Sequence, residues 1–450
     1  MTGMTLREIV AAVGGKWCGE DSALDRCADN VVTDSRAAGE GSLFVAIRGE
    51  RTDGHKYIPD VLRKGVAAVF CEEEAAGEPR IVVDDVMKGL HALASWNRSR
   101  LPIPYVAVTG SVGKTTAKEM IYAVLSARYQ TFKTPGSLNG QVGIPVAFMS
   151  LSEAHEAAVV EMGISLPGEM ERIARVVRPD MCVFMNITDA HLEALHDREG
   201  ILREKKAILS SSSDFAPVVV NGDDDMLRVH EFGRPTVRFG LGEHNDVRAE
   251  NIRANADCSE QYCDIVFEDR RFAVTIPAYG NYMVYAALAG AAVGFALGLT
   301  DEEIANGIAA YETVGHRSRV MKLRDFTLID DCYNANPTAN RAAVTSMLAL
   351  PGRHVCVMGV MRELGENSRA FHVEVGRFLA EKGIDLLLTQ GDEAAYFHEG
   401  APEIPGGHYG TKKELAEALK AAVQPGDVVL VKASRGAAFE DVVAEIQNWA

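Results

Sequence analysis

The sequence predicts an α/β fold of three domains: a small N-terminal α/β domain, a central phosphate-loop domain with a parallel sheet, and a C-terminal Rossmann-like domain. The chain has 450 residues, enough for about three domains of roughly 150 residues each. Short apolar runs alternate with helical segments along most of its length, which is typical of sheets covered by helices. A stiff connector, Leu101-Pro-Ile-Pro104, ends the first segment, since proline disfavours helix in the residue before it.

This connector marks the first domain boundary, and a second series of alternating strands and helices starts at about residue 314. Together they predict domains at residues 1–99, 100–313 and 314–450. In the first domain, residues 41–47 are apolar enough to form a strand, and residues 57–65 are predicted to form a short helix. The first domain is therefore expected to mix short strands with short helices.

The central domain repeats a buried strand followed by a polar turn, as in a parallel sheet. Its strand candidates are residues 105–109, 157–163, 182–188 and 217–223, and its first helix is expected over 116–129. Residues 282–299 carry no charge but are rich in Ala and Gly, whereas a membrane span needs about 20 strongly apolar residues with interfacial anchors. We therefore expect a buried helix there and no membrane segment.

The C-terminal domain alternates strand and helix again, which predicts a Rossmann-like sheet. Its strand candidates are residues 326–330, 354–359, 385–389 and 427–432, and its helix candidates are residues 337–349, 367–382, 411–423 and 436–449. Pro337 suits the first position of a helix, because the N–H group that proline lacks would have no partner there.

The composition is acidic and otherwise that of a globular protein. Lys and Arg number 46 and Asp and Glu 63, so the formal net charge is −17, and 47% of the residues are hydrophobic. This balance excludes disordered and fibrous classes and disfavours the coating of nucleic acid by bulk charge. The eight cysteines include no Cys-x-x-Cys pair and the N-terminus has no signal-peptide run, so we expect free thiols in the reducing cytoplasm.

The motif Thr109–Thr116 carries the strongest functional signal. A predicted strand leads into a glycine-containing loop, which is followed by Lys, Thr and a helix. Such glycines let backbone N–H groups point at phosphates, the lysine adds a cation, and a threonine hydroxyl can bind Mg²⁺. The predicted phosphate-binding residues are Gly110, Ser111, Val112, Gly113, Lys114, Thr115 and Thr116. The alternative is a chance glycine-rich turn.

A phosphate loop is shared by enzymes and GTP switches, so it does not identify a reaction. A GTP switch is expected to carry a later Asn-Lys-x-Asp motif that reads guanine, and Asn186-Ile-Thr-Asp189 lacks its lysine. A nucleotide-binding switch without synthetic activity is therefore the less favoured alternative.

Two more strand ends carry candidate metal ligands. Glu161 follows one apolar strand and His191 follows another, and ligands gather at the carboxyl ends of strands in an open parallel sheet. We therefore expect both side chains to lie near Thr115. A carboxylate and an imidazole beside phosphates suit Mg²⁺ or Mn²⁺ better than structural zinc. The alternative for His191 is an ordinary surface or core histidine.

Lys205 occupies an unusual place on its predicted helix. The apolar stripe of that helix is formed by Ile201, Leu202, Ile208 and Leu209, and its centre falls on Lys205. Burial lowers the pKa of a lysine and leaves a neutral, nucleophilic amine, which can react with CO₂ to form a carbamate that bridges metal ions. The alternative is a lysine whose tip reaches water.

Taken together, these motifs resemble those of the Mur ligase family, the ATP-dependent amide-forming enzymes of peptidoglycan precursor synthesis. The resemblance extends along essentially the whole chain. Thr109–Thr116 is similar to the family's ATP loop, and Glu161-Met-Gly163 and Ala190-His-Leu-Glu193 resemble its Mg²⁺ ligands. Lys205 falls where the family carries a carbamylated lysine. The resemblance implies that Thr115, Glu161, His191 and a carbamylated Lys205 hold the metal ions.

Three motifs resemble the family member that joins D-alanyl-D-alanine to UDP-N-acetylmuramoyl-tripeptide. Asp330–Pro337 is similar to its D-D-x-Y-N-A-N-P motif, and Gly359–Gly365 is similar to its G-x-M-x-E-L-G motif. Val431–Arg435 is similar to its K-G-S-R motif, with Ala433 in place of the glycine. The first domain is thereby expected to bind the UDP-sugar, the central domain ATP, and the C-terminal domain the incoming dipeptide.

The resemblance also implies which residues contact the substrates. Thr33–Arg36, Gly41–Ala46 and Asp53–His55 resemble the UDP-sugar end of the substrate site. The implied substrate contacts are Ser35, Arg36, Arg48, His55 and Asn139, with Lys432, Ser434 and Arg435 on the substrate carboxylate. The implied nucleotide contacts, besides the loop, are Asn281, Tyr282, Arg317, Asp330, Asn334 and Asn336.

Two segments depart from the family pattern. Gly280-Asn-Tyr-Met283 stands where the family has G-x-H-N, and Ala286 replaces a later Asn, so the polar contacts to adenine change. An aromatic stack from Tyr282 is the expected substitute. Ser137–Pro145 keeps Asn139 of the family's N-x-N-N-x-x-G-x-P, but Gly140 replaces the neighbouring Asn.

The resemblance implies that ATP phosphorylates a substrate carboxylate and that the dipeptide amine then attacks the acyl phosphate. It implies a cytoplasmic monomer that acts on small molecules, without nucleic acid or membrane partners. Sister enzymes that add a single amino acid and folylpolyglutamate synthases are the nearest alternatives, and Asp330–Pro337 argues against both. Because the adenine segment is altered, a divergent and weakly active paralogue of these ligases is a further alternative. The third residue of the tripeptide is left open between diaminopimelate and lysine.

Overall fold

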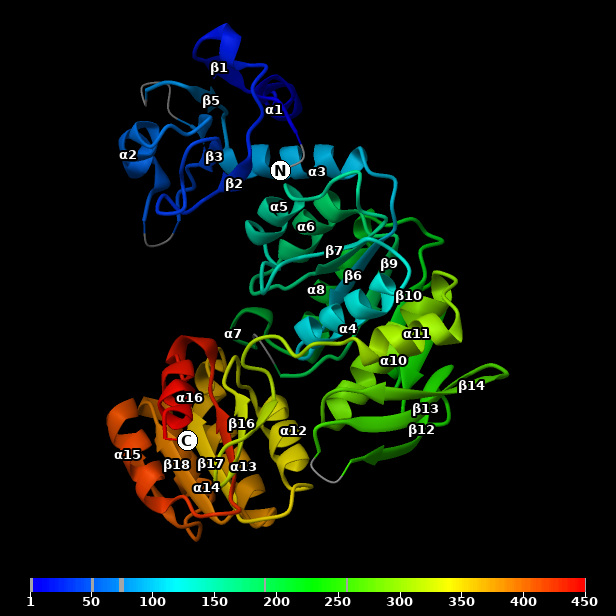
Figure 1. Cartoon of the computed structure of the whole chain (residues 1–450), viewed down its shortest axis with the longest axis vertical. Coiled ribbons are helices and arrows are strands. Elements are labelled where there is room, and N and C mark those ends of the chain that lie inside the picture. Colours follow the sequence, from blue (N-terminus) through cyan, green and yellow to red (C-terminus); the bar gives the residue numbers. More distant parts are fainter. Residues whose placement is uncertain (1–2, 50–51, 73–76, 190–191, 256–257, 450) are drawn as a thin grey trace.

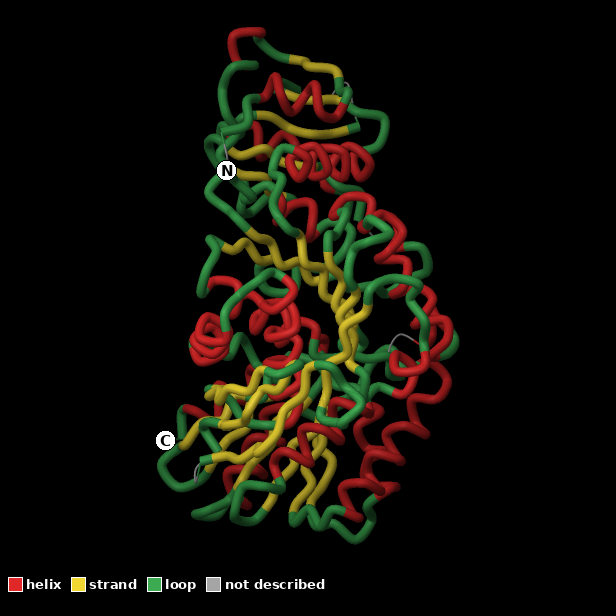
Figure 2. Tube along the Cα trace, turned by 90° about the vertical axis from the view of Figure 1, so that its right-hand side faces the viewer, coloured by secondary structure: helices red, strands yellow, loops and turns green. Residues whose placement is uncertain are grey.

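The computed structural model describes residues 3–49, 52–72, 77–189, 192–255 and 258–449, and its strands form three sheets. The sheets follow one another along the long axis of the molecule in chain order (Figure 1 and Figure 2). Each sheet is packed against helices, which confirms the predicted α/β class with three domains.

The first sheet has the strand order β1-β5-β4-β3-β2, and its strands pair in parallel except for β1 with β5. Its strands are β1 (Lys16–Cys18), β2 (Asn30–Val32), β3 (Ser42–Val45), β4 (Ala68–Cys71) and β5 (Arg80–Val82), and its helices are α1 (Leu6–Val13), α2 (Ile58–Arg63) and α3 (Val86–Ser99). Helix α3 leads to the connector and packs on the central domain, where Asn97 Nδ2 donates to Phe148 O at 2.8 Å.

The central sheet has nine strands in the order β14-β13-β12-β11-β10-β9-β6-β8-β7. Its parallel strands are β6 (Tyr105–Thr109), β7 (Thr131–Lys133), β8 (Ala157–Glu161), β9 (Met181–Phe184), β10 (Val218–Asn221), β11 (Thr236–Gly240) and β12 (Val247–Ala254). Strands β13 (Gln261–Phe267) and β14 (Arg270–Ile276) continue it as antiparallel hairpins. The four predicted strands are confirmed as β6, β8, β9 and β10, whereas the sequence reading did not predict the hairpins.

Two helical layers cover this sheet. One face packs against α4 (Lys114–Ser126), α10 (Asn281–Ala296) and α11 (Asp301–Ala309). The other face packs against α5 (Gly143–Phe148), α6 (Glu169–Val177) and α8 (Arg198–Lys206), and the short helices α7 (Leu192–Leu195) and α9 (Asp225–Val229) lie at strand ends. The predicted buried helix is confirmed as α10, and no helix of the described ranges has the length and apolar character of a membrane span.

The C-terminal sheet has the order β15-β16-β20-β17-β18-β19, in which β15 alone runs antiparallel to its neighbour. Its strands are β15 (Arg319–Lys322), β16 (Thr327–Asp331), β17 (His354–Gly359), β18 (Leu386–Gln390), β19 (Gly406–Tyr409) and β20 (Val428–Lys432). Helices α12 (Pro337–Met347), α13 (Ser368–Glu381) and α14 (Tyr396–Gly400) pack on one face, and α15 (Lys412–Ala422) and α16 (Glu440–Gln447) pack on the other.

Element boundaries differ from the predictions mainly at chain turns. The predicted helix over residues 57–65 begins as a 3₁₀ turn at Gly54–Tyr57 before α2. The helix predicted over 436–449 starts only at Glu440, because Ala438 adopts a left-handed conformation with φ of 51°. Pro337 does occupy the first turn of α12, as predicted.

Candidate active site

A cavity of about 820 Å³ lies between the central and C-terminal domains, at the carboxyl ends of their parallel strands. The central domain contributes the loop between β6 and α4 and the ends of β8, β9 and β10, and the C-terminal domain contributes the ends of β16 and β20. The predicted site residues that line it are Ser111, Val112, Gly113, Lys114, Thr115, Thr116, Asn139, Glu161, Asn281, Tyr282, Arg317, Asn334, Asn336, Lys432, Ser434 and Arg435. Segments from two domains thus meet at one place, as open parallel sheets favour.

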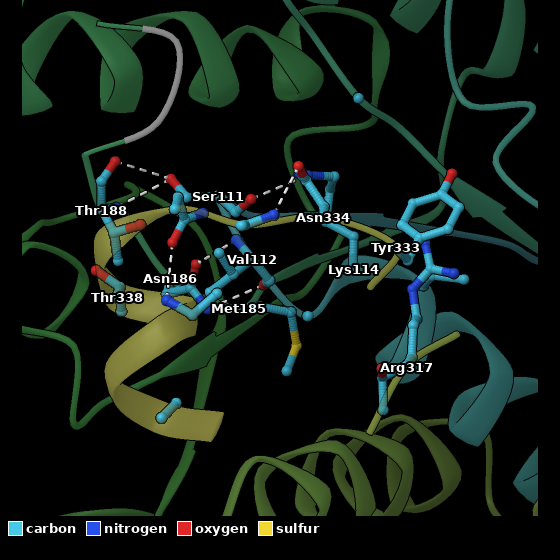
Figure 3. Close-up of a pocket in the computed structure, with 18 of the residues that line it drawn as sticks. Ser111, Val112, Lys114, Met185, Asn186, Thr188, Arg317, Tyr333, Asn334 and Thr338 are labelled. Carbon is cyan, nitrogen blue, oxygen red and sulfur yellow. Dashed lines mark hydrogen bonds between the residues drawn. The ribbon is translucent and has the colours of Figure 1, made fainter. Parts of the chain in front are cut away.

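The loop between β6 and α4 is shaped by two glycines and fixed by Asn186. Gly113 precedes α4 with φ of 77°, a left-handed conformation that glycine adopts without strain, and a Cβ on Gly110 would lie 2.9 Å from Met185 Cβ. Asn186, at the end of β9, accepts from Val112 N at 2.9 Å and donates to Val112 O at 3.0 Å (Figure 3). The loop is therefore held open in front of the helix N-terminus, where anions are stabilised.

Lys114 places a cation at this loop. Its Nζ donates to Gly110 O at 2.8 Å and to Ser111 O at 3.2 Å. Burial lowers the pKa of Lys114, and the nearby Glu161 carboxylate opposes that shift. The side chain is thus placed to neutralise phosphate oxygens at the loop.

Glu161 and Thr115 form the centre of the site. Thr115 Oγ1 donates to Glu161 Oε2 at 2.7 Å, and Asn139 Nδ2 donates to Glu161 Oε1 at 2.7 Å. Both Thr115 and Glu161 are buried. A hydroxyl and a carboxylate beside a phosphate loop are the hard oxygen donors that Mg²⁺ and Mn²⁺ prefer, so these two residues fit the predicted ion.

Arg317 brings a second cation from the segment that enters the C-terminal domain. Its Nη2 donates to Thr115 Oγ1 at 3.0 Å, and its guanidinium lies 3.5 Å from the centre of the Tyr333 ring (Figure 3). The C-terminal domain thereby contacts the phosphate-loop side of the cavity directly.

Lys205 is fully buried beneath the loop. Its side chain has no exposed area, and its Nζ donates to Gly110 O at 2.9 Å. Burial is the main cause that lowers the pKa of Lys205 well below its ordinary value, and the charge of Lys114 adds to it. The prediction of a buried lysine at the centre of the apolar stripe is confirmed, and the alternative of a tip in water is wrong. His191, the other predicted ligand, lies outside the described residues.

The C-terminal residues of the site are largely held by one another. Lys432 Nζ lies 2.5 Å from Asp331 Oδ2 and donates to Asn334 O at 3.0 Å, so its charge is paired inside the protein. Ser434 Oγ donates to Ala335 O at 3.2 Å. Arg435 is the more exposed cation of this group. Asn336 accepts from Ala339 N at 2.8 Å and so caps α12.

The structure separates Asp330 from its neighbour Asp331. Successive residues of a strand point to opposite faces. Asp331 lines the cavity, whereas Asp330 does not, and its carboxylate meets His316 Nδ1 at 2.6 Å on the other side. The geometry therefore favours Asp331 over the predicted Asp330 as a contact for a molecule in the cavity.

The predicted UDP-sugar residues lie in the first domain, outside this cavity. Arg36 pairs with Asp34, and Arg48 pairs with Asp53 at 2.6 Å and with Glu72 at 3.1 Å. His55 lies with Nδ1 2.8 Å from Asp53 Oδ1 and accepts from Glu72 N at Nε2, 3.2 Å away. Their place in substrate binding stays a prediction.

The altered adenine segment has a definite structure. Met283 and Ala286 are buried in the core, so they offer no polar contact to the cavity. Tyr282 lines the cavity, and its ring packs on Gly280, where a Cβ would meet Tyr282 Cε1 at 2.3 Å. The hydroxyl of Tyr282 donates to Tyr279 O at 2.7 Å, which fixes the ring at the cavity wall.

Three contributors to the site were not predicted. Asn186 holds the loop, Tyr285 lines the cavity and donates to Asp223 at 2.9 Å, and Lys118 supports Glu161 from below. Lys118 is fully buried, donates to Thr134 O at 2.8 Å and Gly136 O at 2.9 Å, and lies 2.9 Å from Glu119 and 4.0 Å from Glu161. Residue 118 lies one turn after Lys114 on α4, but the helical period alone does not show that its side chain is buried.

Lys118→Met is expected to destabilise the central domain by about 3 kcal/mol, because it leaves buried carbonyls and part of the Glu119 charge without a partner. Urea unfolding monitored by circular dichroism measures this loss. Lys133→Met is the matched control, since Lys133 pairs with the same Glu119 but its side chain is 32% exposed. The control should cost about 1 kcal/mol or less, and equal losses in both variants would contradict the role of burial.

Comparisons with known proteins agree with this geometry. Residues 28–107 match the model of the Mur ligase family catalytic domain, residues 108–294 that of the Mur ligase middle domain, and residues 316–435 that of the Mur ligase glutamate ligase domain. The chain belongs to the Mur ligase family.

Individual relatives point to one activity within this family. The chain is 34% identical over 427 residues to the UDP-N-acetylmuramoyl-tripeptide–D-alanyl-D-alanine ligase of Bacillus subtilis (strain 168), covering 92% of each chain. A crystal structure of MurF from Acinetobacter baumannii superposes with a TM-score of 0.90 at 30% identity, covering 99% of this chain and 98% of that one. MurF ligase from Thermotoga maritima in complex with ADP has a TM-score of 0.85 at 31% identity, covering 96% of this chain and 99% of that one.

Proposed function

We propose that this protein is an ATP-dependent ligase that joins D-alanyl-D-alanine to UDP-N-acetylmuramoyl-tripeptide in peptidoglycan precursor synthesis. The observation that carries this function is the cavity in which Lys114, Thr115 and Glu161 of the central domain face the Asp331–Asn336 segment of the C-terminal domain. The relatives with this activity cover almost the whole chain, and one of them was solved with ADP.

The reaction needs ATP because a carboxylate oxygen is a poor leaving group. The substrate carboxylate attacks the γ-phosphorus of ATP, and ADP leaves. The amine of the dipeptide then attacks the acyl carbon, inorganic phosphate leaves, and the nitrogen loses a proton to give the amide. The first step brings two anions together, so cations that neutralise phosphate oxygens supply most of the catalysis.

Different residues of the cavity are proposed to bind the phosphates, the metal ion and the substrate carboxylate. The loop N–H groups and Lys114 bind the β- and γ-phosphates, and Arg317 adds charge from the C-terminal side. Thr115 and Glu161 would hold Mg²⁺, which would neutralise charge at the phosphates. Arg435, the exposed cation of the C-terminal group, is suited to the substrate carboxylate, while Lys432 positions Asp331.

We propose that Lys205 acts as a carbamate. Its neutral amine adds to CO₂, a C–N bond forms, and the nitrogen loses one proton, so that a neutral group becomes an anionic carbamate. The position of Nζ beneath Gly110 supports this role, because a carboxylate there would lie under the phosphate loop. His191 is the proposed partner of the carbamate at a second metal ion.

The three domains have separate tasks in this proposal. Residues 1–99 bind the UDP-sugar through Ser35, Arg36, Arg48 and His55, residues 100–313 bind ATP, and residues 314–450 bind the dipeptide. The enzyme acts in the cytoplasm as a monomer on small molecules. Asn139, bonded to Glu161, links the substrate-side loop to the metal site.

Mass spectrometry of a reconstituted reaction tests the function. The protein is incubated with ATP, Mg²⁺, D-alanyl-D-alanine and UDP-tripeptides that end in diaminopimelate or in lysine, and a UDP-pentapeptide should appear with one of them. Phosphate release should require both the UDP-substrate and the dipeptide. Product from single amino acids or folates, or phosphate release without an acceptor, would favour a sister enzyme or a switch instead.

Tyr282→Ala is expected to raise the KM for ATP about tenfold, because stacking of a base on an aromatic ring contributes about 1–3 kcal/mol. Steady-state kinetics at saturating UDP-tripeptide and dipeptide measures this value. Tyr282→Phe keeps the ring and loses only the bond to Tyr279 O, so its KM should match the parent. An unchanged KM in the alanine variant would reject the stack.

A further inference from the structure

A cluster of three side chains lies at the end of β16, on the face turned away from the cavity. Asp330 and Cys332 are two positions apart on extended chain, so they point to the same side, opposite to Asp331. His316 reaches them from the segment that precedes β15. The candidate ligand atoms of His316, Asp330 and Cys332 all lie within 4.8 Å of one another.

This cluster holds a buried carboxylate that has no Lys or Arg partner among the described residues. His316 Nδ1 lies 2.6 Å from Asp330 Oδ2, and Cys332 Sγ donates to Asp330 Oδ1 at 3.2 Å. The Asp330 side chain is 3% exposed, Cys332 is 1% exposed, and the His316 side chain is 37% exposed. Among the described residues, no Lys or Arg forms an ion pair with Asp330. A buried charge is costly unless it is paired or binds a metal.

We propose that His316, Asp330 and Cys332 form a binding site for a thiophilic divalent cation of the zinc type. An imidazole, a carboxylate and a thiolate are the donors that Zn²⁺ takes in tetrahedral sites, and a water molecule can complete the set. The ion displaces the thiol proton, so the dication, the thiolate and the carboxylate sum to zero charge in a buried place.

The present geometry needs only a small change to accept the ion. Metal–ligand distances of about 2.0–2.3 Å separate tetrahedral ligands by about 3.3–3.6 Å. The contacts of 2.6 Å and 3.2 Å are shorter than this and must lengthen by less than about 1 Å, and the distance between the His316 and Cys332 ligand atoms, which is at most 4.8 Å, must change by no more than about 1.5 Å. The half-exposed His316 can make most of that movement by rotation about its side-chain bonds.

The site lies where the chain enters the C-terminal domain. Tyr333 N donates to His316 O at 3.0 Å, and the next residue, Arg317, donates to Thr115 at 3.0 Å. An ion that ties His316 to the end of β16 therefore fixes the backbone from which Arg317 reaches the central domain. The bound cation is inferred to stiffen this joint between the two domains.

Cobalt titration of the full chain tests the site, because thiolate ligation gives Co²⁺ an intense near-ultraviolet charge-transfer band that oxygen ligands alone do not give. The parent should bind a single equivalent with this band, and Zn²⁺ should displace it. Cys332→Ser should lose the band, and His316→Gln should lower the affinity for Zn²⁺ by at least about tenfold, since even outer-shell changes cost 10–100-fold. Cys27→Ser removes an exposed thiol elsewhere and should match the parent.

The variants separate a lost ligand from a lost fold. His316 is half-exposed, so His316→Gln should keep the parental melting temperature, which protects the test if Cys332→Ser is unstable. The absence of a thiolate band in the parent, or equal Zn²⁺ affinity in the parent and His316→Gln, would overturn the site. The cobalt band and the Zn²⁺ affinity are both measured without ligase activity. The failure of this metal site can therefore be distinguished from a failure of the proposed function.

Discussion

Lys114→Ala is expected to lower turnover by at least about 10²–10³-fold, the loss typical of removing one group that stabilises charge in a transition state. Lys114 Nζ lies at the phosphate loop, 2.8 Å from Gly110 O, and the side chain is half-buried and close enough to the Glu161 carboxylate for its charge to act on Lys114. Its ammonium is therefore held where the charge of the transferring phosphoryl group develops. Removing it leaves the first domain untouched, so binding of the UDP-substrate should persist.

Single-turnover measurements and calorimetry distinguish this role from a structural one. The rate of acyl-phosphate formation should fall in Lys114→Ala, while the affinity for UDP-tripeptide and the melting temperature stay near the parent. Lys206→Ala, a lysine outside the cavity, serves as the control. A variant that turns over at more than one tenth of the parental rate would contradict the proposed role of Lys114.

Lys205→Ala is expected to abolish most activity and to regain part of it with added formate or acetate. The substitution removes the proposed carbamate and leaves space under Gly110 O, where a short carboxylate can bind in its place. Gly110 O keeps its hydrogen bond from Lys114 Nζ, so the lost bond from Lys205 should cost only about 0.5–1.5 kcal/mol, and the new cavity adds to that loss. The assay is the ligase rate with and without added carboxylate, after removal of bicarbonate.

The matched control for this experiment is the neighbouring Lys206→Ala, which changes a lysine that is only partly buried. Labelled ¹³CO₂ should give a carbamate resonance in the parent and in Lys206→Ala, and none in Lys205→Ala. If carboxylates restore no activity and the parent shows no carbamate signal, Lys205 is a neutral structural amine and the carbamate proposal fails.

Sequence patterns predicted those parts of the fold and site that depend on local periodicity. Glu161 was found because it ends a continuous apolar strand, and Lys205 because it interrupts an apolar helical stripe, and both lie against the loop. The hairpins of β12–β14 were missed because their exposed faces carry charges such as Glu250 and Arg271, which break up the apolar runs. Half-buried antiparallel strands alternate between apolar and polar residues. A continuous apolar run, by contrast, marks a strand that is buried on both faces, as in a parallel sheet.

Side-chain partners across the chain were beyond these patterns. Lys118 looks like a surface residue of an amphipathic helix, and only the approach of the turn at Thr134 and Gly136 makes its burial favourable. Asp330 and Asp331 are chemically identical neighbours, and the pleat of β16 decides which one faces the cavity. Such choices depend on tertiary register, which a single sequence does not specify.

The hydrogen bond from Arg317 to Thr115 joins the start of the C-terminal domain to the phosphate loop of the central domain, so the proposed reaction would depend on the docking of these two domains. A fragment that stops before the last domain would retain the phosphate loop but lack this guanidinium, so it should bind nucleotide without consuming it. If the proposed function holds, the bound ATP would receive the charge of Arg317 only while the domain proposed to bind the dipeptide is docked on the central domain, and this dependence would limit ATP hydrolysis in the absence of the acceptor.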